Sequence, residues 1–216
     1  MMKRKMFLIS DMTDSFQEFC KHFVEACGAE KARIAFLMQG GKDWKKYFDQ
    51  YEACFRKSEF DDFFPVFPNK NFSFKSEMLD QLASATGIFV GGGNTFRYIK
   101  AYAESPLSDV IRSKYLNGVP YAGLSAGAII SVRLGFLPGF VIKPHFKQKN
   151  RFFELISKMQ SEKKEIGLGM DDGIWIEIVD DCNFTFHGNG KCYLFRFEND
   201  HKFEFEVFKT DMMVIL

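Results

Sequence analysis

The sequence lacks several features that would assign it to a specialised class. No apolar run approaches the roughly 20 residues that a helix needs to cross a bilayer. The 29 basic and 28 acidic residues leave a net charge of +1, so no basic excess is available to neutralise nucleic-acid phosphates. The first residues, MMKRKMFLIS, carry positive charges but no long apolar stretch with a small-residue cleavage site, unlike a signal peptide. We therefore expect a cytoplasmic protein that binds neither membrane nor nucleic acid.

The sequence also contains few cysteines, and they are not spaced as a metal-binding or redox motif. The five cysteines are scattered and form no C-x-x-C motif; they are Cys20, Cys27, Cys54, Cys182 and Cys192. This pattern indicates reduced thiols in a cytosolic protein and predicts no metal site. The sequence contains no internal repeat or Pro/Ser-rich linker, so we expect a single domain over residues 1–216. Most of the 27 phenylalanines are expected in its core.

Strand-like and helix-like segments alternate over the first two-thirds of the chain. Short apolar runs predict strands, and apolar residues spaced three and four apart predict helices. The predicted strands are 5–10, 33–38, 63–67, 87–90 and 119–123, and the predicted helices are 15–27, 44–56, 76–85, 95–102, 107–117 and 125–131. This alternation predicts an α/β fold with a mostly parallel central sheet flanked by helices on both faces.

The pattern changes to strands alone after Lys163. The segments 173–179, 182–187, 191–197 and 202–208 are predicted strands, joined by turns at 188–190 (GNG) and 198–200 (END). Such turns are typical of hairpins. We therefore expect C-terminal antiparallel hairpin strands at the edge of the sheet.

The strongest chemical signal is the G-x-S-x-G segment 123–127 (GLSAG), which lies between a predicted strand and a predicted helix. A serine on such a sharp turn projects its hydroxyl beyond the sheet edge, and small neighbours relieve the crowding. The first N–H groups of the following helix have no helical partner and are free to stabilise an oxyanion. Ser125 is therefore a predicted nucleophile; the alternative is a serine that only caps the helix.

A second signal is the glycine-rich segment 91–94 (GGGN), which follows a buried strand. Consecutive glycines let backbone N–H groups approach a ligand closely. We expect this loop to form one half of an oxyanion hole and the N–H of Ala126 to form the other. Asn94, at the end of the loop, is a predicted substrate contact. A plain turn or a phosphate loop are the alternatives, although the segment matches neither nucleotide-binding motif in full.

A nucleophilic serine needs a base, and the sequence offers four histidines. His145 follows an apolar segment, and Pro144 restricts the backbone beside it. His22 lies within an ordinary amphipathic helix, His187 borders a hairpin turn, and His201 lies in a charged turn. By elimination, His145 is the predicted base.

The third member of such a site is a carboxylate that orients the imidazole. Asp171 and Asp172 stand just before the predicted strand 173–179, again at a strand end. Asp172 is the preferred candidate. Asp171, or no acid at all, stays open, because an Asp-Asp-Gly sequence is also a common solvated turn.

Three blocks together resemble peptidase E, an aspartyl dipeptidase, and its relative cyanophycinase. They are 88–96 (IFVGGGNTF), 118–128 (GVPYAGLSAGA) and 143–146 (KPHF), and the resemblance runs over nearly the whole chain. It implies a fold like that of class I glutamine amidotransferases, with serine in place of the cysteine nucleophile. The match also implies that Ser125 is the nucleophile, that His145 is the base, and that Gly92, Gly93 and Ala126 line the oxyanion hole.

The chain departs from this family in one respect. Peptidase E has a longer segment between its serine and histidine, which carries an aspartate proposed for its triad. Residues 126–144 of this chain contain no acidic residue. The family also has an acidic residue before a Gly-x-x-Ile strand, and Asp172 matches that position.

We therefore predict a serine peptidase, a dipeptidase-like hydrolase of a peptide or related amide bond in a small peptide. No metal or organic cofactor is implied, and a monomer or homodimer is the expected state. The alternative is a non-catalytic or regulatory member of the same fold that binds a small ligand. The missing acid between Ser125 and His145 favours that alternative.

Overall fold

The computed structural model describes residues 3–199 and 202–216, so Asp200 of the predicted turn and His201 lie outside the described residues. Strands and helices alternate in the first part as β1 (Lys5–Ile9), α1 (Phe16–Ala26), β2 (Ile34–Leu37), α2 (Trp44–Arg56), β3 (Phe63–Val66), α3 (Ser76–Ser84), β4 (Gly87–Val90), α4 (Thr95–Tyr98), α5 (Leu107–Leu116), β5 (Tyr121–Leu124) and α6 (Ala126–Arg133). The second part contains β6 (Phe140–Pro144), α7 (Phe152–Ser161), β7 (Ile166–Met170), β8 (Ile174–Val179), β9 (Asn183–Gly188), β10 (Cys192–Asn199), β11 (Lys202–Phe208) and β12 (Met213–Ile215). No helix among the described residues is both long and apolar enough to cross a membrane.

The central sheet has eight strands in the order β12-β9-β8-β1-β5-β4-β2-β3. The pairs from β1 through β5, β4 and β2 to β3 are all parallel. On the other side of β1, strands β8, β9 and β12 are antiparallel. The predicted α/β fold with a mostly parallel sheet and C-terminal antiparallel strands is therefore confirmed.

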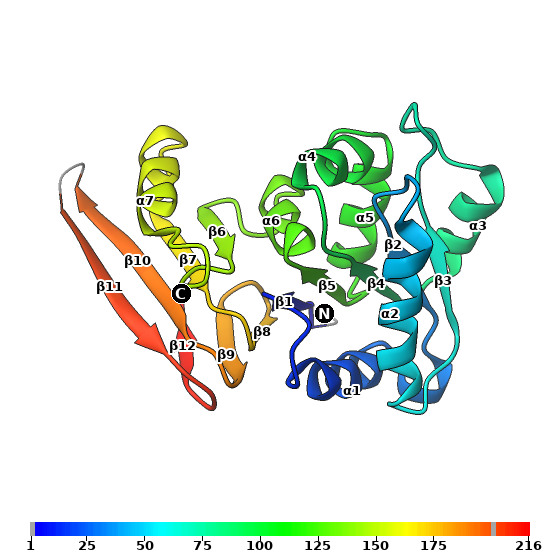
Figure 1. Cartoon of the computed structure of the whole chain (residues 1–216), viewed down its shortest axis with the longest axis horizontal. Coiled ribbons are helices and arrows are strands. Elements are labelled where there is room, and N and C mark those ends of the chain that lie inside the picture. Colours follow the sequence, from blue (N-terminus) through cyan, green and yellow to red (C-terminus); the bar gives the residue numbers. More distant parts are fainter. Residues whose placement is uncertain (1–2, 200–201) are drawn as a thin grey trace.

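Helices cover both faces of this sheet (Figure 1). Successive strand residues point to opposite faces, so Phe7 packs into one core and Leu8 into the other. The Phe7 core is rich in aromatic side chains from α1, α2 and the sheet. The Leu8 core receives α3, α5 and α6. Many of the phenylalanines are thus buried in the core, as expected.

A second sheet lies beside the first, with the order β11-β10-β7-β6 (left side of Figure 1). Helix α7 packs on it through Leu155 and Met159, and a Cβ at Gly167 of β7 would lie 2.4 Å from the Met159 sulfur. The sequence did not predict α7, β7 or β12. Because β7 reads IGLGM, its two glycines weaken the strand signal.

The hairpin predicted around residues 188–190 is wrong. Strand β9 pairs with β8 and β12, whereas β10 pairs with β7 and β11 in the other sheet. The turn at 188–190 therefore carries the chain from one sheet to the other. The unpredicted strand β7 occupies the position beside β10 that a hairpin would have given to β9.

The turn from β5 into α6 brings three backbone segments very close together. A Cβ on Gly123 would lie 2.4 Å from the carbonyl carbon of Gly127. A Cβ on Gly127 would lie 2.3 Å from the carbonyl oxygen of Val90 in β4. The Tyr121 hydroxyl donates to the Gly127 carbonyl at 2.7 Å. These glycines therefore let α6 begin directly over β4 and β5.

Gly127→Ala tests this packing. Alanine in an exposed helix position usually gains about 1 kcal/mol over glycine. Here the new Cβ meets the Val90 carbonyl, so we expect the free energy of unfolding to fall by about 1–3 kcal/mol, measured by urea denaturation. The matched control is Gly139→Ala, where a Cβ would meet nothing within 4 Å; we expect a change within about 0.5 kcal/mol. Equal stability of the two variants would contradict the packing argument.

Candidate active site

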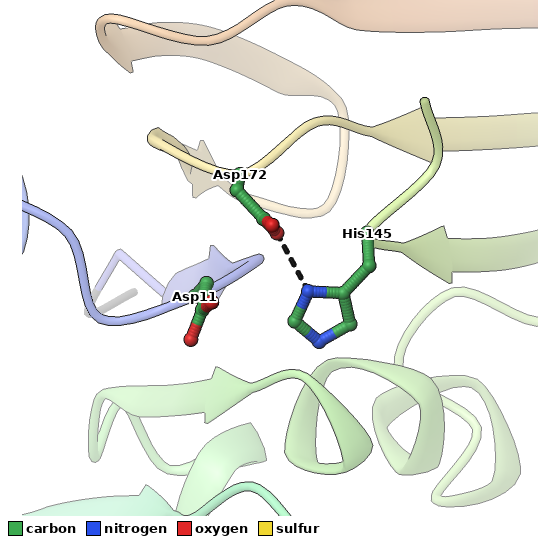
Figure 2. Close-up of side chains that lie close together, drawn as sticks. All are labelled: Asp11, His145 and Asp172. Atoms are coloured by element: carbon green, nitrogen blue, oxygen red, sulfur yellow. Dashed lines mark hydrogen bonds and ion pairs between the residues drawn. The ribbon is translucent and has the colours of Figure 1, made fainter. Parts of the chain in front are cut away.

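The site lies where the carboxyl ends of strands from both sheets meet. Ser10 and Asp11 follow β1, Ser125 follows β5, and the glycine loop follows β4. Strands β6 and β7 of the second sheet are parallel, so the residues that follow them, His145 and then the Asp171–Asp172 pair, also emerge at one edge. Figure 2 shows Asp11, His145 and Asp172 converging from three separate segments.

Ser125 has the strained backbone expected of a nucleophile turn. Its φ is 50° and its ψ is −101°, a region that non-glycine residues rarely adopt. Its N–H donates to the Ile9 carbonyl at 2.8 Å, which fixes the turn to β1. The side chain makes no capping hydrogen bond to α6. Its Oγ instead lies 3.0 Å from Nε2 of His145, so the interpretation as a simple helix cap is wrong.

His145 is held by its backbone as well as its ring. It has a φ of 55°, and its N–H donates to the buried Ser10 hydroxyl at 2.9 Å. The ring is 14% exposed, with Nδ1 lying 2.6 Å from Oδ1 of Asp172 (Figure 2). Nδ1 and Nε2 thus face a carboxylate and a serine hydroxyl, and this fixes the orientation of the imidazole.

The two neighbouring aspartates face different partners. Asp171 is buried; it accepts the Lys147 N–H at 3.0 Å and the Tyr193 hydroxyl at 3.4 Å. Burial and the Asp171 charge raise the pKa of Tyr193. Asp172 faces His145 and also lies 3.2 Å from the Ser10 hydroxyl. Of the two carboxylates that the sequence left open, Asp172 is the one that contacts the imidazole.

Tyrosine hydroxyls hold the glycine loop on both sides of Gly92. The Gly92 N–H donates to the Tyr51 hydroxyl at 3.0 Å, and the Gly92 carbonyl accepts the Tyr98 hydroxyl at 3.2 Å. The N–H groups of Gly93 and Ala126 find no acceptor among the described residues. Of the three predicted oxyanion donors, these two are therefore open, and the N–H of Gly92 is occupied.

Asn94 immediately precedes the helix that follows the glycine loop. Its side-chain oxygen accepts the Arg97 N–H at 3.1 Å and caps α4. Its own N–H donates to the Gln39 side chain at 2.8 Å. The cap gives this side chain a structural role, and its predicted contact with substrate stays a prediction.

A cleft of about 710 Å³ opens in front of Ser125 and His145. Gly92 and Gly93 of the glycine loop also line it. Its other lining residues were not predicted; the charged and phenolic ones are Asp11, Tyr47, Tyr51 and Lys149. Asp11 had a usable signal, since it follows the first strand at the same edge as the site. Tyr51 had none, since it lies within an ordinary amphipathic helix.

One grouping in the described part of the chain has the donor types of a metal site. A carboxylate oxygen of Asp11, a ring nitrogen of His145 and a carboxylate oxygen of Asp172 lie within 4.8 Å of one another. The same His145 and Asp172 are already joined by a hydrogen bond. The expectation that no metal is required stays a prediction.

Comparisons with known proteins agree on one family. The model described as Peptidase family S51 matches residues 6–137, which include Ser125 and the glycine loop but not His145 or Asp172. Peptidase E of Nostoc sp. is 26% identical over 239 residues, covering 91% of this chain and 90% of that protein. Cyanophycinase of Synechococcus elongatus is 29% identical over 121 residues, which cover 45% of this chain and only 38% of that protein.

Two solved structures share the fold. A peptidase from an acI-B1 Actinobacterium superposes with a TM-score of 0.74 at 16% identity, covering 100% of this chain and 98% of that chain. A putative peptidase E protein from Listeria monocytogenes EGD-e gives 0.57 at 17% identity, covering 86% and 98%. At these identities the likeness concerns the fold alone.

Ser10→Ala tests how the His145 segment is held. The change leaves the partly buried His145 N–H without its acceptor, which costs about 1–3 kcal/mol. We expect urea denaturation to show a loss of that size. Ser84→Ala removes an exposed hydroxyl that donates only to the Gln81 carbonyl, and should change stability by no more than about 0.5 kcal/mol. If the two variants were equally stable, the Ser10 hydroxyl would not hold this segment.

Proposed function

The chain belongs to peptidase family S51, and we propose that it is a serine-dependent hydrolase of a peptide or related amide bond. The observation that supports the proposal most is the continuous chain of hydrogen-bonding groups from Ser125 Oγ through the His145 ring to Asp172. Distances of 3.0 and 2.6 Å are those of a nucleophile, its base and the group that orients the base.

The reaction proceeds through an acyl-enzyme. Ser125 Oγ attacks the carbonyl carbon of the substrate while His145 Nε2 removes the hydroxyl proton. Nδ1–H remains hydrogen-bonded to Asp172, which stabilises the imidazolium. The tetrahedral oxyanion is stabilised by N–H groups of the glycine loop and Ala126.

Breakdown of this intermediate expels the leaving amine. His145 gives its proton to the amine nitrogen as the carbon–nitrogen bond breaks, which leaves Ser125 as an ester. Water then loses a proton to His145 and attacks the ester, and the proton returns to Ser125 Oγ as the carboxylic acid departs. Proton transfer to and from one positioned side chain typically raises the reaction rate by about 10²- to 10⁴-fold.

We propose a small peptide, a dipeptide above all, as the substrate. The support is the similarity to proteins named peptidase E, and the cleft of about 710 Å³ has room for a ligand of that size. Dipeptides with an N-terminal aspartyl residue are the first to test, because of the resemblance to an aspartyl dipeptidase.

The alternative function, ligand binding without turnover, loses its specific support. It was favoured by the absence of an acid between Ser125 and His145. Asp172 reaches the His145 ring from the segment between β7 and β8 instead. We therefore propose the hydrolase alone.

A pair of neighbouring substitutions tests this function. Asp172→Asn removes the charge that stabilises the imidazolium, so kcat should fall by about 10³- to 10⁴-fold. Asp171→Asn changes the adjacent carboxylate, which faces Lys147 and Tyr193, and should keep kcat close to wild type. The measurement is release of free amino acid from a dipeptide panel, with Ser125→Ala as the background.

The results distinguish a wrong assignment of Asp172 from a wrong assignment of the reaction. Equal losses in the two aspartate variants would contradict the assignment of Asp172. Failure of the folded wild-type protein to exceed the Ser125→Ala background on every peptide and on a simple ester would contradict hydrolysis itself.

A further inference from the structure

Tyr51 connects helix α2 to the glycine loop beside Ser125. Its side chain is 2% exposed, yet it lines the cleft, and its hydroxyl accepts the Gly92 N–H at 3.0 Å. The glycines make room for it: a Cβ on Gly91 would lie 2.9 Å from ring atom Cε2 of Tyr51 and 3.2 Å from its hydroxyl oxygen. A Cβ on Gly92 would lie 3.5 Å from the Ser125 Cβ. The Tyr51 hydroxyl thus contacts the loop next to the nucleophile.

The hydrogen of this hydroxyl has no acceptor among the described residues. A phenol both accepts and donates, and Tyr51 accepts from Gly92 while donating to no described atom. Buried tyrosine hydroxyls usually find a partner for their hydrogen. Since the protein offers none and the residue borders the cleft, the hydrogen is available to a ligand there.

The opposite side of the loop is fixed by a second phenol. The Tyr98 hydroxyl donates to the Gly92 carbonyl at 3.2 Å. In a trans peptide the carbonyl and the following N–H point in opposite directions, so this bond directs the Gly93 N–H away from Tyr98. Gly93 and Ala126 therefore remain direct donors, whereas the N–H of Gly92 is already used by Tyr51.

We propose that the Tyr51 hydroxyl is a catalytic hydrogen-bond donor to the oxyanion, acting as a relay between the Gly92 N–H and the substrate. The inference rests on the proposed acyl-enzyme mechanism. In this arrangement the N–H of Gly92 polarises the phenol oxygen, which strengthens the bond that the phenol donates. Tyrosine is among the side chains that serve as oxyanion donors.

The electrostatics of Tyr51 suit a donor. Burial raises its pKa to about 12, while the hydrogen bond from Gly92 acts in the opposite direction. The phenol therefore keeps its proton wherever His145 acts as a base, and it donates without becoming charged.

The test compares Tyr51→Phe with Tyr115→Phe. Tyr115 is also a buried tyrosine, but its hydroxyl donates to Asp181 and it does not line the cleft, so it is a matched control. Loss of one oxyanion donor lowers kcat by about 10²- to 10³-fold, and we expect this for Tyr51→Phe with little change in KM. Tyr115→Phe should keep the wild-type kcat. Tyr51→Phe should also lose affinity for a peptide aldehyde, which forms a tetrahedral adduct, more than for the dipeptide product.

A purely structural role for Tyr51 predicts different results. Removing the hydroxyl frees the Gly92 N–H, so an unchanged or increased kcat in Tyr51→Phe would overturn the relay. If Tyr51→Phe does not fold, 3,5-difluorotyrosine placed at position 51 keeps the shape and makes the phenol more acidic. The relay then requires the alkaline limb of the kcat profile to move to lower pH, and an unmoved limb would overturn it.

Failure of the Tyr51 relay and failure of the proposed hydrolase give different results. Without Ser125-dependent turnover in the wild-type protein, the hydrolase proposal fails, and the relay with it. With Ser125-dependent turnover that Tyr51→Phe leaves intact, the hydrolase stands and only the relay fails.

Discussion

One buried hydroxyl joins the two halves of this site. Ser10 follows β1 of the large sheet, whereas His145 and Asp172 follow strands of the second sheet. The Ser10 oxygen accepts the His145 N–H at 2.9 Å, and it lies within donating distance of both the Met170 carbonyl oxygen (3.1 Å) and the Asp172 carboxylate (3.2 Å). Because Ser125 follows the strand beside β1, this hydroxyl helps to set the position of Ser125 relative to His145 and Asp172.

The site also stores backbone strain that its surroundings must hold. Ser125 and His145 both have positive φ, at a cost of about 1–3 kcal/mol each. The Ser125 turn is held by its bond to the Ile9 carbonyl and by the packing of Gly127 against β4. The His145 turn is held by Ser10. Tyrosines from α2 and α4 hold the glycine loop in the same way, so Ser125, His145 and the loop are each held by a hydrogen bond with a neighbouring segment.

The sequence predicts those parts of the fold and the site that depend on local patterns, but not those that depend on side-chain direction or on contacts between distant segments. Strand–helix alternation and the GLSAG segment are local patterns, and both led to the correct elements. The choice between Asp171 and Asp172 depends on which way adjacent residues point, and composition does not encode that direction. Strand β7 was not predicted because its two glycines weaken the strand pattern. Without β7 as the neighbour of β10, strands β9 and β10 were wrongly predicted to form a hairpin. Tyr51 was missed because it reaches the site from a helix whose pattern indicates only packing. The likeness to glutamine amidotransferases stays a prediction.

The proposed hydrolase requires an activated nucleophile at Ser125, which intact-mass analysis after incubation with a small fluorophosphonate detects. We expect one covalent adduct on the wild-type protein and none on Ser125→Ala, because the Ser125 hydroxyl lies within hydrogen-bond reach of the His145 ring, which is the base of the proposed mechanism and is itself paired with Asp172. An unmodified wild-type protein that is demonstrably folded, or an adduct that persists in Ser125→Ala, would show that Ser125 is not an activated nucleophile.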